Sequence, residues 1–263
     1  WLQTAGFPDT IWGNDKEKKG NYEYVEDIRA RGLWVNYLTG GSKANPGQKG
    51  LGIPVDVCLA LHTDGQKATD DTTTIGTLAI YCAQDNDGRQ VFGNGISRQL
   101  NRDLADYVQT QIVEDIRRTT EPRWTRRQLR NASYGEARYP VVPTALIEIL
   151  NHSTMGDMRY GLDPQFRMTV ARAIYKGLLR FLHEQDGREV IVEPLPVQKM
   201  QIKRAKTSGK EGTESIVLSW KPTADPIEPT AQPTHYYIYT REDTGQWERQ
   251  RVKGISKTFS LVR

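Results

Sequence analysis

The sequence predicts an α/β fold, in which helices layer a sheet, followed by a small all-β sandwich. In the first two thirds of the chain, short apolar runs of strand length alternate with longer amphipathic segments. Helical periodicity stops near residue 190, and short strand-like runs separated by proline-rich turns follow. We therefore expect an α/β domain over residues 1–190 and a β domain over residues 191–263.

Three apolar runs in the first domain read as buried strands. They are IPVDVCLAL at 53–61, GTLAIYC at 76–82 and VVPTALIEIL at 141–150. Continuous apolar runs of this length are typical of a sheet that is covered on both faces.

Three helices are expected between and after these strands. The first spans Tyr22–Leu38 and is closed by Gly40 and Gly41. In the second, which Ser97 would cap, apolar residues recur at about every fourth position from Leu100. The third begins at Asp163-Pro164, an N-cap followed by proline in the first turn, and Gly187 ends it.

The second domain shows no helical periodicity. Its apolar runs are SIVLSW at 215–220 and HYYIYT at 235–240, and a proline-rich region separates them. Short strands divided by turn signals are typical of a β-sandwich.

Charge and composition exclude several classes of protein. The net charge of +4 comes entirely from the segment after Val190, with 12 basic and 8 acidic residues, and this is too weak for a nucleic-acid footprint. No apolar run reaches the roughly 20 residues of a membrane span. Two cysteines, Cys58 and Cys82, exclude a disulfide-rich scaffold and a four-cysteine metal site; we expect free thiols, with a single bridge as the lesser alternative.

Two residues stand out as chemical candidates. His62 ends a buried strand, and the carboxyl ends of strands are where ligands and catalytic groups collect in α/β sheets. Taken alone, such a histidine is more often structural. Glu148 lies among apolar neighbours in TALIEIL, where a charge is costly to bury. It is either an edge-strand glutamate facing water or a carboxylate poised for proton transfer.

An ordered set of motifs resembles the zinc-dependent N-acetylmuramoyl-L-alanine amidase family. The set is HTD at His62, SRQLNRDLADYVQTQI from Ser97 and YPVVPTALIEILNHSTMGDM from Tyr139. The resemblance spans residues 1–187 and implies a mixed sheet. The tail resembles fibronectin type III, with Trp220 and Tyr236 as core aromatics on facing strands, and with strands missing from the 73 residues after Val190.

The resemblance implies roles for two residues. His62 matches the last zinc-binding histidine, and Glu148 matches the catalytic glutamate, so both should lie on neighbouring strands and open on one edge of the sheet. The family's other ligands, a histidine in a Gly-His-Gly strand end and a helical glutamate, have no match before His62. We expect them to precede Trp1, and we expect residues 1–263 alone to bind zinc weakly and to be inactive.

Four further residues are candidates for supporting roles. Asp64 stands where the family often has asparagine, and it either orients His62 or caps a turn. Glu136 and Arg138 precede the catalytic strand; they bind a peptide carboxylate, orient Glu148 or form a surface ion pair. His152 lies either at the rim of the site or in a loop without function.

The favoured function is a zinc hydrolase of the bacterial cell envelope that cleaves the amide between N-acetylmuramic acid and L-alanine. Its partner would be peptidoglycan or a muramyl peptide, and its location periplasmic, envelope-bound or secreted. The alternative is a metal-free, amidase-like module that binds glycan or cell wall. A polysaccharide lyase is weaker, although similar proteins of gut-type Gram-negative bacteria carry a xanthan lyase label, because no cluster of proton-abstracting side chains is evident.

Overall fold

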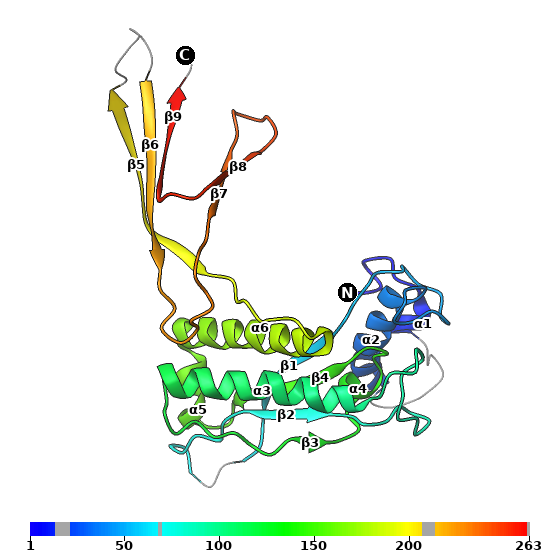
Figure 1. Ribbon diagram of the computed structural model, residues 1–263. Coiled ribbons are helices and arrows are strands. Elements are labelled where there is room, and N and C mark those ends of the chain that lie inside the picture. The colour runs from blue at the N-terminus through cyan, green and yellow to red at the C-terminus, as the bar shows by residue number, and fades with distance from the viewer. Residues whose placement is uncertain (14–21, 68–69, 207–213, 262–263) are drawn as a thin grey trace. The chain divides into compact units, whose positions relative to one another are not determined.

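The computed structural model describes residues 1–13, 22–67, 70–206 and 214–261, and divides into two compact units, Trp1–Arg188 and Glu189–Arg263 (Figure 1). Each unit is an arrangement of its own, the first mixed α/β and the second built of strands.

The first unit contains a mixed sheet of four strands. They are β1 (Cys58–Asp64), β2 (Leu78–Tyr81), β3 (Arg130–Asn131) and β4 (Thr144–Asn151), in the order β1-β4-β2-β3. β1 and β4 are parallel, β2 and β4 antiparallel, and β2 and β3 parallel. The predicted fold class, a mixed sheet with helices and a small final β region, is confirmed.

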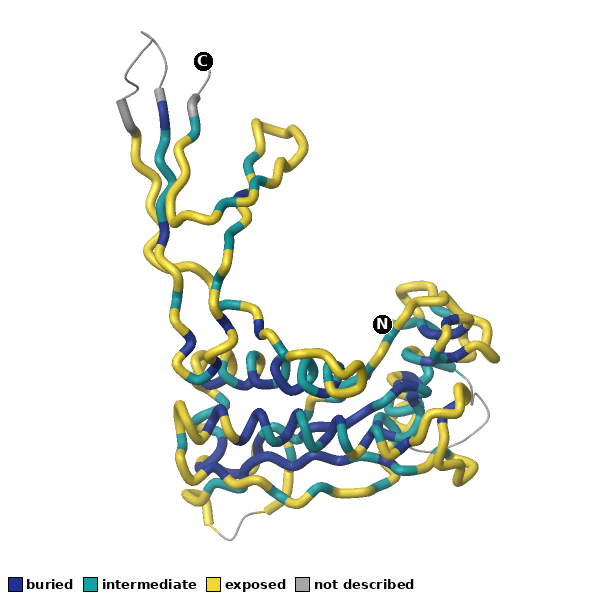
Figure 2. The backbone as a smooth tube through the Cα atoms, in the orientation of Figure 1, coloured by how far each residue is buried: buried dark blue, intermediate teal, exposed yellow. Residues whose placement is uncertain are grey.

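Two long helices, α3 (Gln99–Thr119) and α6 (Pro164–Asp186), cover one face of the sheet. Their apolar stripes meet Ala79, Ala145 and Ile147 in the main core, which appears as buried backbone in Figure 2. Between the helices, the buried Lys176 Nζ lies 2.6 Å from Asp115 Oδ2. Because strand side chains alternate between faces, Leu78, Ile80 and Leu146 form a smaller core on the other face.

The remaining helices of this unit are shorter or lie beside the sheet. They are α1 (Asp9–Trp12), α2 (Tyr22–Thr39), α4 (Gly135–Arg138) and α5 (Met155–Gly161). α2 ends where the glycines predicted, since Gly41 adopts a φ of +84°, which favours glycine. The short helix α4 contacts α2, β2 and β4, and so it connects the helical end of the unit with the sheet.

The caps of the long helices are partly as predicted. Asp163 Oδ1 accepts the Gln165 N–H at 2.9 Å, and Gly187 ends α6 at a φ of +62°. The prediction that Ser97 is the N-cap of α3 is wrong by one residue. Arg98 holds that position in a near-helical conformation, and Ser97 Oγ accepts the Gln99 N–H at 3.2 Å from outside it.

The first strand is displaced from its predicted bounds of 53–61. Residues 53–57 are not strand, in keeping with Pro54, which has no N–H for a ladder. The strand instead continues through polar residues to Asp64, because it pairs with β4 as far as Asn151. The prediction that this run is a buried strand is also wrong, because β1 is an edge strand whose residues are half-buried or exposed, Leu61 among the exposed ones.

The second unit contains two antiparallel sheets. β5 (Leu195–Lys206), β6 (Glu214–Thr223) and β9 (Ser256–Leu261) form one sheet, and β7 (Tyr236–Thr240) and β8 (Glu248–Val252) form a hairpin. Trp220 is buried, as predicted. Its ring meets that of Tyr236 edge-on, with 5.2 Å between the ring centroids. The fibronectin assignment and the boundary at residue 190 remain predictions.

Candidate active site

The two principal candidates lie side by side. β1 and β4 pair in parallel, and His62 is directly opposite Glu148 in that register. The predicted juxtaposition at one edge of the sheet is therefore confirmed. By strand alternation both side chains share the face of Leu78 and Leu146, away from α3 and α6.

Glu148 is a half-buried glutamate within an apolar strand. Its Oε2 atom is buried and has no hydrogen-bond partner in the described part of the chain. Burial raises the pKa of Glu148 above its ordinary value of 4.5, and nearby Asp64 acts in the same direction. His62, Arg127 and His152 oppose this rise in pKa without outweighing it. A carboxyl group of this kind can hold a proton at higher pH than a surface glutamate does.

His62 is held by a carboxylate from another element. Its Nε2 lies 2.8 Å from Glu136 Oε2, a distance at which an N–H group donates to a carboxylate. The other oxygen, Glu136 Oε1, accepts from Arg31 Nη1 at 2.9 Å, and Arg31 also pairs with Asp27 on α2. A chain of contacts thus runs from β1 through α4 to α2. His62 is 31% exposed and Glu136 is 13% exposed.

The donor atoms near His62 do not complete a zinc site. A catalytic zinc takes about three protein ligands and leaves a position open. Across residues 1–13, 22–67, 70–206 and 214–261, no group of three or more His, Cys, Asp or Glu side chains is placed to hold a metal ion. Two such side chains, His62 and Glu136, meet at this point, and they bond to each other. The described residues therefore do not fit zinc by themselves.

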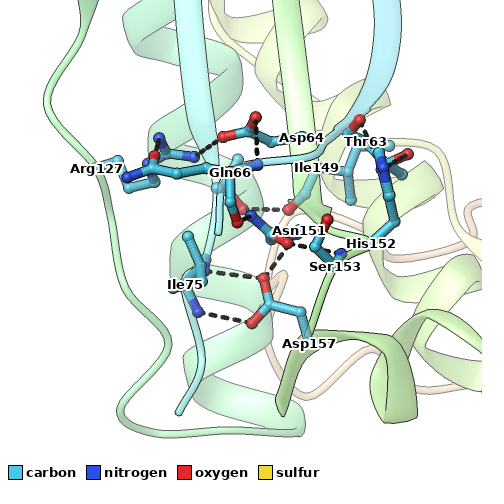
Figure 3. A network of polar contacts seen from close by, with 12 residues as sticks. Thr63, Asp64, Gln66, Ile75, Arg127, Ile149, Asn151, His152, Ser153 and Asp157 are labelled. Atoms are coloured by element: carbon cyan, nitrogen blue, oxygen red, sulfur yellow. Dashed lines mark hydrogen bonds and ion pairs between the residues drawn. The ribbon is translucent and has the colours of Figure 1, made fainter. Parts of the chain in front are cut away.

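Asp64 caps the turn that follows β1. Its Oδ1 accepts the Gln66 N–H at 3.2 Å, and its Oδ2 accepts from Arg127 Nη1 at 2.6 Å (Figure 3). Arg127 also donates to Gln66 Oε1 at 2.7 Å. Of the two roles considered for Asp64, the structure supports the turn cap. Through this contact Asp64 holds Arg127 near Glu148, and the charge of Arg127 opposes the rise in the pKa of Glu148.

His152 lies at the end of the same two strands. Its Nδ1 is 3.0 Å from Thr63 Oγ1 and 3.1 Å from the Thr63 carbonyl oxygen, so the ring bridges from the end of β4 to β1 (Figure 3). A Cβ on Gly65 would meet His152 Nε2 at 3.2 Å, which shows how closely the turn passes. His152 therefore borders the strand ends that carry His62 and Glu148.

A buried carboxylate, Asp157, fixes the loop behind this edge. It accepts the Ile75, Gly76 and Asn151 N–H groups at 2.8, 3.1 and 2.7 Å (Figure 3). The sequence carried a signal for it that we had not used: Thr154 and Asp157 have capping-box spacing, and Thr154 Oγ1 accepts the Asp157 N–H. Arg31 and Arg127 also escaped the sequence analysis, and no local pattern marks either residue.

The Arg138 side chain makes its described contacts with Ser133 and Tyr139, and its roles in binding a peptide carboxylate or orienting Glu148 remain predictions. Its guanidinium donates to Ser133 Oγ at 2.7 Å and to the Tyr139 hydroxyl at 3.2 Å, and it stacks over the Tyr139 ring. The surface ion pair that we considered with Glu136 is absent from the contacts described, because Glu136 turns toward His62 and Arg31. The local reason is α4, a single turn that points neighbouring side chains in different directions.

A separate hollow lies away from these residues. A hollow of about 640 Å³ lies at the opposite ends of the strands, between residues 54–56 and 141–143, and neither His62 nor Glu148 lines it.

Cys58 and Cys82 are both free. In the described ranges no helix combines the length and the apolar character that crossing a membrane requires.

Comparison with known proteins gives partial likenesses of fold. No family model and no curated protein matches the chain. Among solved structures, an N-acetylmuramoyl-L-alanine amidase from Clostridium difficile 630 is 19% identical, with a TM-score of 0.43 over 60% of this chain and 66% of that one. The CwlD amidase from Clostridioides difficile, in complex with the GerS lipoprotein, is 15% identical, with a TM-score of 0.44 over 66% and 70%.

A third likeness is to the amidase Ami1 from Mycobacterium smegmatis, 18% identical, with a TM-score of 0.42 over 60% of this chain and 61% of that one. The chain thus spans about two thirds of the length of these proteins. At this degree of similarity, the function has to be argued from the residues of the chain itself.

Proposed function

We propose that this chain carries the proton-transfer group of a hydrolase that cleaves the amide between N-acetylmuramic acid and L-alanine in peptidoglycan. The observation that carries the proposal is Glu148, directly opposite His62, with a raised pKa and a buried oxygen that has no hydrogen-bond partner among the described residues. The ordered motifs that led to both residues support the amide as the bond that is cleaved. Such a substrate places the protein in the cell envelope, the periplasm or outside the cell.

Glu148 would act twice in the reaction. It first accepts a proton from the water that attacks the amide carbon, and it then gives that proton to the amine that leaves with L-alanine. A half-buried carboxyl group with a raised pKa is suited to both steps, since it is a stronger base than a surface glutamate and keeps the proton until the amine departs. Thr63, His152 and Asp64 define the rim of the strand ends around it.

The argument for zinc in the proposed function depends on one residue, His62. In the family that the sequence resembles, the matching histidine is a zinc ligand, and zinc polarises the carbonyl and acidifies water there. In this chain, His62 Nε2 is bonded to Glu136. Metal binding at that nitrogen would have to displace Glu136 or recruit it as a ligand, with further ligands from outside the described residues.

A second function is favoured by that same bond. Since His62 is already satisfied by Glu136, and since no three-donor group occurs in the described ranges, the domain could recognise cell-wall glycan or peptide without cleaving it. Glu148 would then serve as a hydrogen-bond acceptor for the ligand. The two functions share a partner, peptidoglycan, and differ in turnover.

The decisive experiment uses the natural polypeptide that contains residues 1–263, supplied with zinc and a soluble muramyl-peptide substrate. We expect release of the peptide, measured by mass spectrometry, and a fall of about 10²–10⁴-fold in rate for Glu148→Gln. Glu114→Gln, an exposed change on α3, is the matched control. Atomic absorption should show less zinc for His62→Ala and unchanged zinc for Glu148→Gln.

Each outcome selects between the functions. Wild-type turnover in Glu148→Gln would remove this residue from the mechanism. No turnover by the wild-type protein, together with retention on insoluble peptidoglycan that Glu148→Gln weakens, would replace the hydrolase by the binding module.

A further inference from the structure

The hairpin of the second unit presents one exposed face of aromatic and arginine side chains. Ile238 and its ladder partner Gln250 turn inward, so the alternate residues turn outward. The outward residues are Tyr237 and Tyr239 on β7 and Arg249 and Arg251 on β8, and Arg241 and Trp247 continue the same alternation beyond the ladder. We call these six residues the hairpin face.

The rings of the hairpin face are unusually open to solvent. Tyr237 is 45% exposed, Tyr239 56% and Trp247 61%. Single exposed apolar residues are common on protein surfaces, but contiguous groups of large rings mark sites of interaction. Here three rings fall within eleven residues of one hairpin.

Two of the three arginines stack on rings of the hairpin face, and the third is hydrogen-bonded. The Arg249 guanidinium carbon lies 4.8 Å from the Tyr237 ring centroid, and that of Arg241 lies 4.8 Å from the Trp247 centroid. Arg251 donates to His235 Nδ1 at 3.3 Å, and the His235 ring meets Tyr237 edge-on. None of these three arginines forms an ion pair with an acidic side chain in the described ranges, so their N–H edges remain available to a ligand.

Two chemistries therefore meet on one surface. Aromatic faces carry negative potential and pack against the C–H groups of a pyranose ring. A guanidinium fork matches a carboxylate and binds it with two hydrogen bonds. The segment from Ile191 has 12 basic and 8 acidic residues, so its net charge also favours an anionic partner.

We propose that the hairpin face is a binding site for an acidic polysaccharide, a glycan whose pyranose rings carry carboxylates. A nucleic acid fits less well, because strong phosphate binding uses about 6–10 basic contacts and this face offers three. The site lies in the second unit and does not depend on the hydrolase proposed for the first, so either proposal can fail without the other.

Binding of the full chain to polygalacturonate tests the site, with neutral dextran as the comparison polymer, by affinity electrophoresis and isothermal titration. We expect binding to polygalacturonate that weakens with salt and at least tenfold weaker binding for Tyr239→Ala with Trp247→Ala. Arg249→Gln with Arg251→Gln should have a similar effect. Thermal melting by circular dichroism verifies that each variant is folded.

Matched controls separate this face from general charge and hydrophobicity. Tyr24→Ala removes an exposed ring from the first unit, and Lys203→Gln with Lys257→Gln removes two charges from the other sheet of the second unit. Both controls should bind within twofold of wild type. The proposal is overturned if polygalacturonate is not bound, if dextran binds equally well, if single-stranded DNA competes more strongly, or if controls and face variants weaken binding alike.

Discussion

Replacing Glu148 by methionine should stabilise the first unit at neutral pH. The side chain lies between the β-ladder partners His62 and Leu78, and its Oε2 is buried with no hydrogen-bond partner in the described chain. Methionine has a similar length, brings no polar atom and fills irregular space readily. The substitution therefore removes an unsatisfied group without opening a large cavity.

The expected gain follows from the cost of that group. An unsatisfied buried acceptor costs about 1–3 kcal/mol. For a domain of this size, 1 kcal/mol corresponds to roughly 2–4 °C in melting temperature. We therefore expect Glu148→Met to gain about 1–2 kcal/mol at pH 7, which is about 2–8 °C.

The gain should depend on pH with a definite sign. The pKa of Glu148 is raised in the folded protein, so the unfolded chain ionises first as pH rises above 4.5. The native state of the wild type then loses stability until the folded carboxyl group has ionised as well. At pH 4 the carboxyl group is mostly protonated in both states, and the advantage of methionine should be smaller than at pH 7.

Urea denaturation followed by circular dichroism at pH 4 and pH 7 measures both quantities. Glu114→Met, an exposed change on α3, controls for added apolar surface and should show no gain that grows with pH. A methionine variant less stable than wild type at pH 7, or a difference that does not narrow at pH 4, would refute the reasoning.

Two further predictions concern buried polar groups. Lys176→Met should lower the free energy of unfolding, measured with urea, by about 3–5 kcal/mol, because it leaves Asp115 buried without its cation. Adding Asp115→Leu should recover most of this loss. A loss below about 1 kcal/mol in the single variant contradicts the prediction. Asp157→Asn should lower the free energy of unfolding by about 1–3 kcal/mol, because at least one of the three backbone N–H groups would then face the N–H₂ group of the asparagine. Hydrogen exchange at the Ile75, Gly76 and Asn151 amides should become faster, and unchanged exchange rates would contradict the prediction.

Local chemistry accounts for what the sequence predicted well. The bounds of α6 follow from an N-cap aspartate, a proline in the first turn and a C-terminal glycine, all of which act within a few residues. The pairing of His62 with Glu148 was predicted from two apolar strands that end at one edge, and the ordered motifs indicated that these strands belong to one site. At 53–61 an apolar run was the sole basis for predicting a strand, and the bounds of that strand were wrong, since β1 spans Cys58–Asp64.

Distant pairings account for what could not be predicted. Arg127 meets Asp64 across 63 positions, and Arg31 meets Glu136 across 105. Such partners are set by how the sheet and helices stack, and a polar residue in a loop or on a helix surface gives no sign of them. Glu136 was singled out for its place before the strand of Glu148, yet its contact with His62 depends on how α4 packs, which the sequence does not reveal.

These contacts give Glu148 and His62 different weight as indicators of function. His62 is satisfied by Glu136, so its position is explained by structure alone and is compatible with either cleavage or binding. Glu148 has a buried oxygen without a hydrogen-bond partner in the part of the chain that the structure describes, and it breaks the apolar pattern of its strand. A cost of that kind is expected where a ligand or a reaction needs the group and is hard to account for otherwise. A Glu148 variant that gains stability and loses activity would therefore identify a functional residue, whereas a His62 variant that loses both would leave its role undecided.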